Sequence, residues 1–181
     1  QECAAGLIRI RRQGEQLAFT APPLVRSGGV EHELLQRICR GLGIEPQTVV
    51  QARWADNGPG WVALLLGDRE QVLALKPDYA QLSGLAIGVV APWSTERDGD
   101  EAQFEVRAFI AGEGMPEDPV TGSLNAGLAQ WLIGEGLAPS CYVASQGTAM
   151  GRAGRVSIEQ VGADIWVGGL AVTCISGQLH L

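Results

Sequence analysis

Histidine is scarce in this chain of 181 residues: it has two, and one of them, His180, lies in the C-terminal tail. A Ser/His/Asp triad is therefore not credible. Long hydrophobic runs are missing too, since stretches such as LAIGVVAPW are too short to span a bilayer. The net charge of −7 argues against a nucleic-acid partner, because binding the phosphate backbone needs a basic face. We expect neither a nucleic acid nor a membrane as partner.

The cysteines lack the spacing of a metal site. Cys3, Cys39, Cys141 and Cys174 are far apart and form no CxxC or Cys/His pattern. They stand in apolar contexts, so we expect buried free thiols. The sequence also has no N-x-S/T sequon and no signal peptide, which together favour a reducing cytoplasm. It begins with Gln rather than Met, so a targeting segment could have been lost with the true N-terminus.

The elements that the sequence does contain predict a mixed α+β domain. Apolar residues make up 46% of the chain and charged residues 18%, which excludes a disordered protein. The order of elements lacks the regular βαβ alternation of a parallel sheet. The expected elements are a hairpin at 6–20 around Gly14, a linker at 21–29, a helix at 30–43, strands at 48–53 and 61–66, a helix from Asp68 to Leu75, a strand at 86–91, a charged loop at 94–103, a strand at 103–110, a helix after 121, and strands at 142–146, 155–159, 164–168 and 170–175, with 178–181 as a candidate for a last strand.

One stretch, EDPVTGSLNAGLAQWLIGEG at 117–136, runs from a polar loop into an apolar helix. Its large apolar residues recur at i, i+4, i+7 and i+8, and the other faces are small or apolar. A helix that is apolar nearly all round is normally buried on every side. We therefore expect a strongly curved, mostly antiparallel, barrel-like sheet around this central helix.

The start of this helix is the best candidate for chemistry. Thr121, Gly122 and Ser123 offer an N-cap hydroxyl and free backbone N–H groups, and Asp118 lies five residues before Ser123. These groups could bind a carboxylate-bearing substrate and hold a polar group over its reactive carbon. Alternatively, Asp118 and Ser123 merely cap the helix, and the residues alone leave both possibilities open. The positive end of the helix dipole favours a charged Asp118, which would act as an acceptor rather than an acid.

Other clusters are weaker candidates. The glycines in AGEGM and MGRAGR could contact phosphate, but neither stretch follows a strand and opens a helix as a nucleotide loop does. Arg152 and Arg155 could pair with a substrate carboxylate, although solvated arginines beside glycine turns are common. We therefore favour turns and solvated arginines here.

The stretch EDPVTGSLNAGLAQWL resembles the signature of the PhzF-like family of phenazine-biosynthesis proteins, which has the diaminopimelate epimerase fold. Three further stretches resemble the closing half of such proteins: FEVRAF, SQGTAMGRAGRVSI and VGGLAVTCISGQL. The resemblance implies two similar lobes, each a barrel-like sheet around a central helix. It also implies an active site between the lobes, no metal or organic cofactor, and commonly a homodimer.

The resemblance also implies roles for individual residues. By position, Asp118 and Ser123 match the family's polar active-site residues, and Gly122 and Ser123 match backbone donors for the substrate carboxylate. Asn57 and Gly58, in NGPGW, resemble more loosely the Asn-Pro substrate loop of the epimerases. Thiol epimerases and proline racemases have a cysteine where this chain has Asp118. The implied chemistry is therefore acid/base isomerisation by carboxylates rather than by two thiols.

The sequence departs from the family in one respect. It contains neither the proton-transferring glutamate nor the Gly-His pair of the family's first lobe. We therefore expect residues 1–20 to be the last hairpin of that lobe and residues 21–181 to form the second, C-terminal lobe. The implied function is isomerisation of a small carboxylate-bearing metabolite, and the alternative is a non-catalytic binding or scaffold module. Expected partners are the substrate and either a second copy of the chain or the missing lobe.

Overall fold

The computed structural model describes the backbone of residues 2–3 and the complete residues 6–112 and 116–178. Its strands are β1 (Glu2–Cys3), β2 (Gly6–Leu7), β3 (Ile10–Gln13), β4 (Gln16–Thr20), β5 (Arg26–Gly29), β6 (Val49–Asp56), β7 (Trp61–Leu66), β8 (Ala86–Pro92), β9 (Phe104–Ile110), β10 (Glu117–Asp118), β11 (Cys141–Gln146), β12 (Gly154–Val161) and β13 (Asp164–Leu170). The α-helices are α1 (His32–Leu42), α2 (Arg69–Ala74), α3 (Thr95–Asp98) and α4 (Gly122–Gly134), with 3-10 turns at Pro46–Thr48 and Thr148–Met150. No helix in these ranges is long and apolar enough to cross a membrane.

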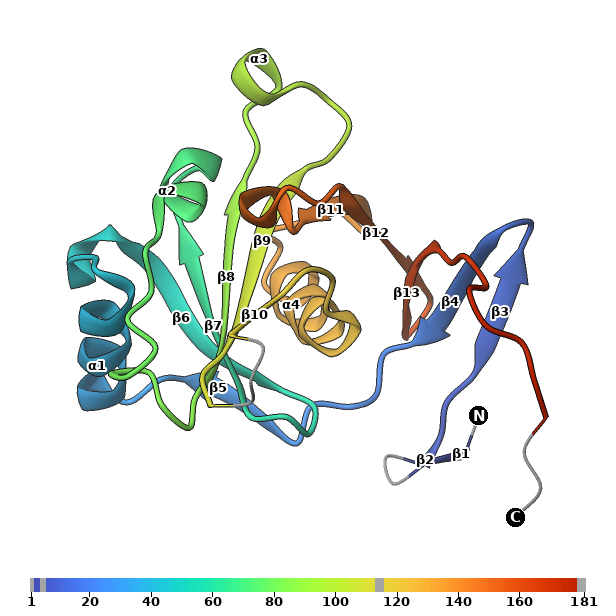
Figure 1. The fold of residues 1–181 in the computed structure, drawn as a ribbon, viewed down its shortest axis with the longest axis horizontal. Coiled ribbons are helices and arrows are strands. Elements are labelled where there is room, and N and C mark those ends of the chain that lie inside the picture. The colour runs from blue at the N-terminus through green and yellow to red at the C-terminus, as the bar shows by residue number, and fades with distance from the viewer. Residues whose placement is uncertain (1, 4–5, 113–115, 179–181) are drawn as a thin grey trace.

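Most strands form one curved sheet in the order β3-β4-β13-β12-β11-β9-β8-β7-β6-β5, with β10 added beside β9. The pairs β7–β8 and β9–β11 are parallel, and the other pairs of this sheet are antiparallel. Figure 1 shows α4 inside the curve of the sheet and α1 on its other side. The predicted α+β class and the curved sheet around a central helix are confirmed, although the sheet does not close into a barrel.

Strand β7 divides the apolar core into two layers. Trp61, Ala63 and Leu65 face the inner core around α4, while the alternate residues between Val62 and Leu66 face an outer core that α1 and α2 cover. All six residues of β7 are buried. This explains why the strand reads as a continuous apolar run, as strands covered on both faces do. Both faces of β7 are therefore covered.

Helix α4 packs close to the sheet because a glycine stands at two of the points where they touch, one on the helix and one on the sheet. A Cβ on Gly127 would lie 2.2 Å from the backbone oxygen of Ala55 on β6. A Cβ on Gly88 of β8 would lie 2.2 Å from the side chain of Leu124. Eight residues of α4 are buried, so the predicted burial on all sides is confirmed.

A buried ion pair joins the outer layer to the loop before α4. Arg107 on β9 donates from Nε and Nη2 to the two carboxylate oxygens of Glu117, at 2.8 and 2.7 Å. Its Nη1 donates to the carbonyl oxygens of Val72 and Leu75, at the C-terminal end of α2. Both side chains of the pair are largely buried. Arg107 therefore fixes β10, and with it the approach to Asp118.

Several local predictions are wrong. Residues 26–29 of the expected linker form β5, an exposed strand that pairs with β6 through its backbone and so shows no apolar alternation. The charged loop at 94–103 contains α3, in which Asp98 accepts a hydrogen bond from the N–H of Ser94. The expected strand at 170–175 does not form, because no described strand pairs with the chain beyond Leu170. Most of the possible strand at 178–181 lies outside the described residues.

The hairpin prediction at 6–20 is confirmed, and its strand β4 pairs with β13 in the main sheet. The cysteine prediction is only partly right. Cys39 is buried, whereas Cys141 and Cys174 are exposed free thiols. Cys141 begins β11 away from both apolar cores, and Cys174 follows the last strand. The side chain of Cys3 lies outside the described residues.

Replacing Gly127 with alanine tests the close approach of α4. We expect Gly127→Ala to lower the free energy of unfolding by about 1–3 kcal/mol, because the added methyl group overlaps the backbone of Ala55. Gly134→Ala in the same helix is the matched control, since nothing lies within 4 Å of its added Cβ. The control should gain up to about 1 kcal/mol from helix propensity. Urea unfolding of both variants measures the difference, and equal effects would contradict the close approach.

Replacing Glu117 with glutamine tests the buried ion pair. We expect Glu117→Gln to lower the free energy of unfolding by about 3 kcal/mol or more, because it leaves the Arg107 guanidinium buried without its counter-charge. Glu101→Gln is the control, because Glu101 is 75% exposed in its pair with Arg155. The control should change stability by less than about 1 kcal/mol. Thermal and urea unfolding measure both variants, and a similar small loss in each would show that Glu117 is not anchored as described.

Candidate functional site

The first turn of α4 presents backbone donors that nothing in the helix can satisfy. The N–H groups of Gly122, Ser123 and Leu124 precede the first intrahelical bond, which runs from Asn125 N–H to Thr121 O. No described residue provides an acceptor for them. Thr121 is the N-cap residue, but its side chain makes no capping bond. The turn is therefore open to an acceptor from outside the helix.

The side chains of Asp118 and Ser123 make no capping bonds either. The hydroxyl of Thr121 donates to Asp118 Oδ2 at 2.7 Å, and the indole N–H of Trp61 donates to Ser123 Oγ at 3.0 Å. Neither side chain accepts from an N–H group of the first turn. The alternative in which both residues serve only as helix caps thus finds no support among the described hydrogen bonds.

Gln146, at the end of β11, holds the loop before α4. Its Nε2 donates to the carbonyl oxygen of Asp118 and to Thr121 Oγ1, both at 2.9 Å. Its Oε1 accepts from the N–H of Thr121 at 3.1 Å and from Asn125 Nδ2 at 2.8 Å. The side chain of Gln146 is fully buried. Because its amide is satisfied on both sides, Gln146 fixes both the backbone around Asp118 and the hydroxyl that donates to the Asp118 carboxylate.

The predicted residues of the NGPGW turn divide into two environments. Asn57 is buried and donates from Nδ2 to the carbonyl oxygen of Ser123 at 2.8 Å. Gly58 is exposed, and its N–H donates to Asp56 Oδ1 at 2.7 Å. The structure therefore brings Asn57 to Ser123 at the start of α4, and leaves Gly58 exposed in the turn.

A cavity of about 470 Å³ lies next to Gly122. Its wall includes the apolar side chains of Phe19, Val120 and Val167. The guanidinium of Arg155 also lines it, but this group already donates to Ser145 Oγ and Glu101, each at 3.1 Å. Arg155 is thus paired rather than simply solvated. Arg152, as expected, is exposed. Gly122 lines this cavity, whereas Asp118 and Ser123 are not among its lining residues.

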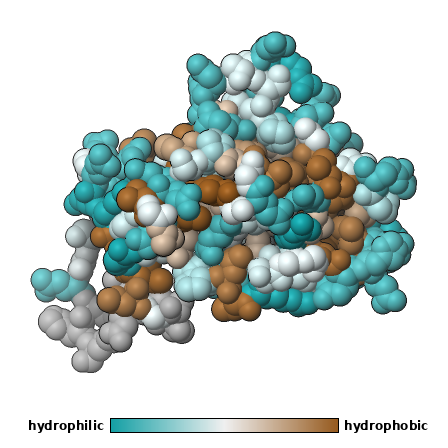
Figure 2. Space-filling model, turned by 180° about the vertical axis from the view of Figure 1, so that it is seen from behind, coloured by the Kyte–Doolittle hydropathy of each residue, from teal (hydrophilic) through white to brown (hydrophobic). Residues whose placement is uncertain are grey.

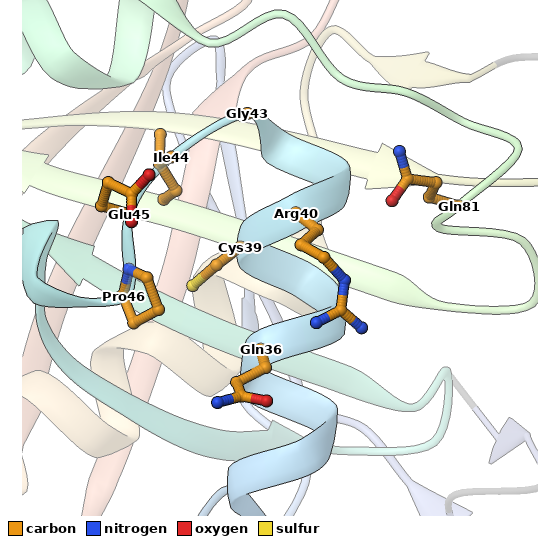
Figure 3. Close-up of a pocket in the computed structure, with 8 residues that line it drawn as sticks. All are labelled: Gln36, Cys39, Arg40, Gly43, Ile44, Glu45, Pro46 and Gln81. Carbon is orange, nitrogen blue, oxygen red and sulfur yellow. The ribbon is translucent and has the colours of Figure 1, made fainter.

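A second hollow, of about 610 Å³, lies on the outer side of the sheet at the C-terminal end of α1 (Figure 3). It contains Cys39, Arg40 and Glu45. Burial and the nearby Glu45 raise the pKa of the Cys39 thiol, so it is not an activated nucleophile. Helix α1 packs on the opposite face of the sheet from α4. This hollow is therefore separate from the candidate site.

The sequence did not reveal Gln146, Asn125 and Trp61 as parts of the site. Asn125 interrupts an otherwise apolar helix. A polar residue on a buried helix needs a hydrogen-bond partner, so its position indicated a buried polar contact. Gln146 and Trp61 stand at the ends of apolar strands, where nothing in the sequence tells which side chain they meet. Among the described residues, no cluster of His, Cys, Asp or Glu could hold a metal ion.

Comparisons with known proteins identify relatives of this chain. An uncharacterized isomerase of Pseudomonas aeruginosa is 30% identical over 182 residues, which cover 98% of this chain and 62% of the relative. The crystal structure of a phenazine biosynthesis protein of the PhzF family from Enterococcus faecalis matches with a TM-score of 0.71 and 23% identity, covering 98% of this chain and 63% of that one. A predicted epimerase from Pseudomonas aeruginosa shares the fold with a TM-score of 0.61 and 18% identity, covering 93% and 63%.

The chain thus spans less than two thirds of the length of these relatives. The family model described as phenazine biosynthesis-like protein, PhzC-PhzF, matches residues 1–177. This match covers both the sheet and the polar start of α4. The chain therefore belongs to the PhzC-PhzF family of phenazine biosynthesis-like proteins.

Proposed function

We propose that this chain is the C-terminal half of a PhzF-type isomerase that moves a proton on a small carboxylate-bearing metabolite. The observation that carries the proposal is the start of α4. There, free N–H donors stand between two side chains, Asp118 and Ser123, that do not cap the helix. The names of the curated relatives as isomerases agree with it.

Each group has a proposed role. The N–H groups of the first turn and the Ser123 hydroxyl hold the substrate carboxylate, as helix N-termini hold anions. Asp118, which accepts from Thr121, orients a polar group of the substrate. In such enzymes, a glutamate of the first lobe takes a proton from one carbon of the substrate and returns a proton at another position of the substrate. One proton is taken and one is returned in this step, and no covalent bond forms between substrate and protein, so the reaction needs no oxidant and no organic cofactor.

The alternative is a module that binds a carboxylate without catalysis. It is favoured by one observation: among the described residues, the hydrogen-bonded network around the start of α4 contains a single carboxylate, Asp118, beside amide, hydroxyl and indole groups. Such a site alone can hold a ligand. Catalysis needs a second acid/base on the other side of the substrate and the exclusion of water.

Association with another lobe or a second copy is also part of the proposal. Exposed apolar side chains occur on β2, on β3, at the end of β13 and in the segment after it: Leu7, Ile10, Leu170, Val172 and Ile175 are 52–91% exposed. Apolar side chains are visible at the lower left of Figure 2, on the side where the chain ends lie in Figure 1. An apolar surface of this kind is typical of an interface. The free cysteines are consistent with a reducing cytoplasm as the proposed location.

Solvent-deuterium exchange tests the enzymatic proposal. We expect the full-length protein to incorporate deuterium into members of a panel of small amino and unsaturated carboxylates, as measured by NMR. Ser123→Ala and Asp118→Asn should each lower the exchange rate by about 10²-fold, because each removes a group that touches the substrate. Their free energy of unfolding should change by only about 1 kcal/mol.

Ser83→Ala and Asp100→Asn are the controls, because both residues are exposed and remote from α4. They should exchange at the wild-type rate. Unchanged exchange in Ser123→Ala and Asp118→Asn would show that neither residue acts in catalysis. Binding of a carboxylate without any exchange by the full-length protein would favour the binding module instead.

Sedimentation velocity tests the association proposal. The full-length protein should sediment as a homodimer, or as a monomer in which a further lobe covers the exposed apolar side chains. Hydrogen exchange of Leu170 and Val172 should then be slow, because these residues are buried in the assembly. Fast exchange at both residues in the full-length protein would contradict an interface at this surface.

A further inference from the structure

The side chain that touches Ser123 is the indole of Trp61, on the inner face of β7. Trp61 is 1% exposed, and its Nε1 lies 3.0 Å from Ser123 Oγ. An indole N–H can only donate a hydrogen bond. Ser123 Oγ must therefore be the acceptor in this pair, and its own proton is left for another partner. No described residue accepts that proton.

We infer that Trp61 is a positioning residue: it fixes the Ser123 hydroxyl as a hydrogen-bond donor toward the ligand of the candidate site. A serine hydroxyl can otherwise rotate and present either its proton or its lone pairs. With one lone pair occupied by the indole, donation is the role that remains favoured. This inference rests on the proposed function, because it assigns a donor role to the Ser123 hydroxyl at the same proposed carboxylate site.

The same β-hairpin also fixes the backbone of Ser123. Asn57, four residues before Trp61, donates from Nδ2 to the carbonyl oxygen of Ser123 at 2.8 Å. Asn57 is 8% exposed, and its Oδ1 is buried without a partner. A buried oxygen without a partner costs free energy. The hydrogen bond from Nδ2 to Ser123 is therefore what holds the Asn57 amide in this orientation. The turn between β6 and β7 thus anchors both the main chain and the hydroxyl of Ser123.

The consequence is that the Ser123 hydroxyl and the first turn of α4 together offer hydrogen-bond donors to a ligand. The Ser123 hydroxyl and the N–H groups of Gly122, Ser123 and Leu124 all need an acceptor. A carboxylate supplies acceptors on both of its oxygens, whereas a primary amide replaces one oxygen with an NH₂ donor. The site should therefore discriminate strongly against the amide of a carboxylate ligand. Specificity of this kind is large because mismatched buried polar groups are left unpaired.

The chain contains a matched control for the indole N–H. Trp131, on α4, is 5% exposed and packs in the same inner core, but its Nε1 is buried without a hydrogen-bond partner. Trp61→Phe and Trp131→Phe therefore remove the same atoms from the same core. Only Trp61→Phe removes a hydrogen bond to Ser123. A difference between the two variants reports this bond rather than the loss of indole volume.

The experiment uses NMR titration of the ¹⁵N-labelled full-length protein with benzoate and, as its uncharged counterpart, benzamide. The aromatic ring of both probes suits the apolar cavity next to Gly122. We expect benzoate to bind wild type at least about 10-fold more tightly than benzamide. Trp61→Phe should weaken benzoate binding about 10-fold, and Trp131→Phe less than about 2-fold. Urea unfolding confirms that both variants are folded under the conditions used.

A second measurement needs no ligand. Compared with the wild-type protein, the Ser123→Ala variant should show a shifted indole N–H resonance for Trp61 and an unchanged one for Trp131. An unchanged Trp61 resonance, or equal weakening of benzoate binding by the two tryptophan variants, would overturn the inference. If benzoate binds no better than benzamide while the Trp61 resonance still responds to Ser123→Ala, the proposed carboxylate site is wrong although the Trp61–Ser123 bond exists. In that case the assigned donor role toward a carboxylate is also overturned.

Discussion

The fold depends on one constraint: α4 has no polar face, so every side of it must be kept from water. A flat sheet covers one side of a helix, whereas a sheet that curves from β6 to β13 covers several. Gly127 and Gly88 let the helix lie close enough for this cover to be continuous. Burying a helix of this kind removes the side chains beyond its first turn from any role in ligand binding. Its N-terminal turn, where the polar groups are, is the part left for chemistry.

The polar start of α4 is held by the same strands that bury its apolar body. Gln146 reaches it from β11, while Asn57 and Trp61 reach it from the turn and strand of β6–β7. Arg107 adds a third anchor through Glu117. Packing and site geometry are therefore coupled, since a shift of the helix in its core would also displace the groups around Ser123. Preorganisation of this kind keeps donors in place without cost when a ligand arrives.

The sequence predicted those helices and strands in which apolar residues recur at the period of a helix or of a strand. Helix α4, the strands β7 and β9, and the hairpin β3–β4 have clear apolar patterns, and each was predicted. Strand β5 escaped because it is exposed and pairs only through its backbone. Asp118 and Ser123 were predicted as site residues because they flank a helix start. Their contacts were not, because the partner Trp61 is 62 residues away from Ser123 in sequence and periodicity carries no information about such pairs.

The pairing of β4 with β13 has a consequence for how the protein is made. Residues 16–20 hydrogen-bond with residues 166–170, although some 150 positions separate them. On the ribosome, the first hairpin therefore emerges long before the strand that it pairs with, at a synthesis rate of about 5–20 residues per second. During those seconds its open edge is exposed to other nascent chains. The hairpin is short and carries Arg11 and Arg12 on β3, the strand at the end of the finished sheet, and charges on such an edge strand oppose unwanted strand pairing.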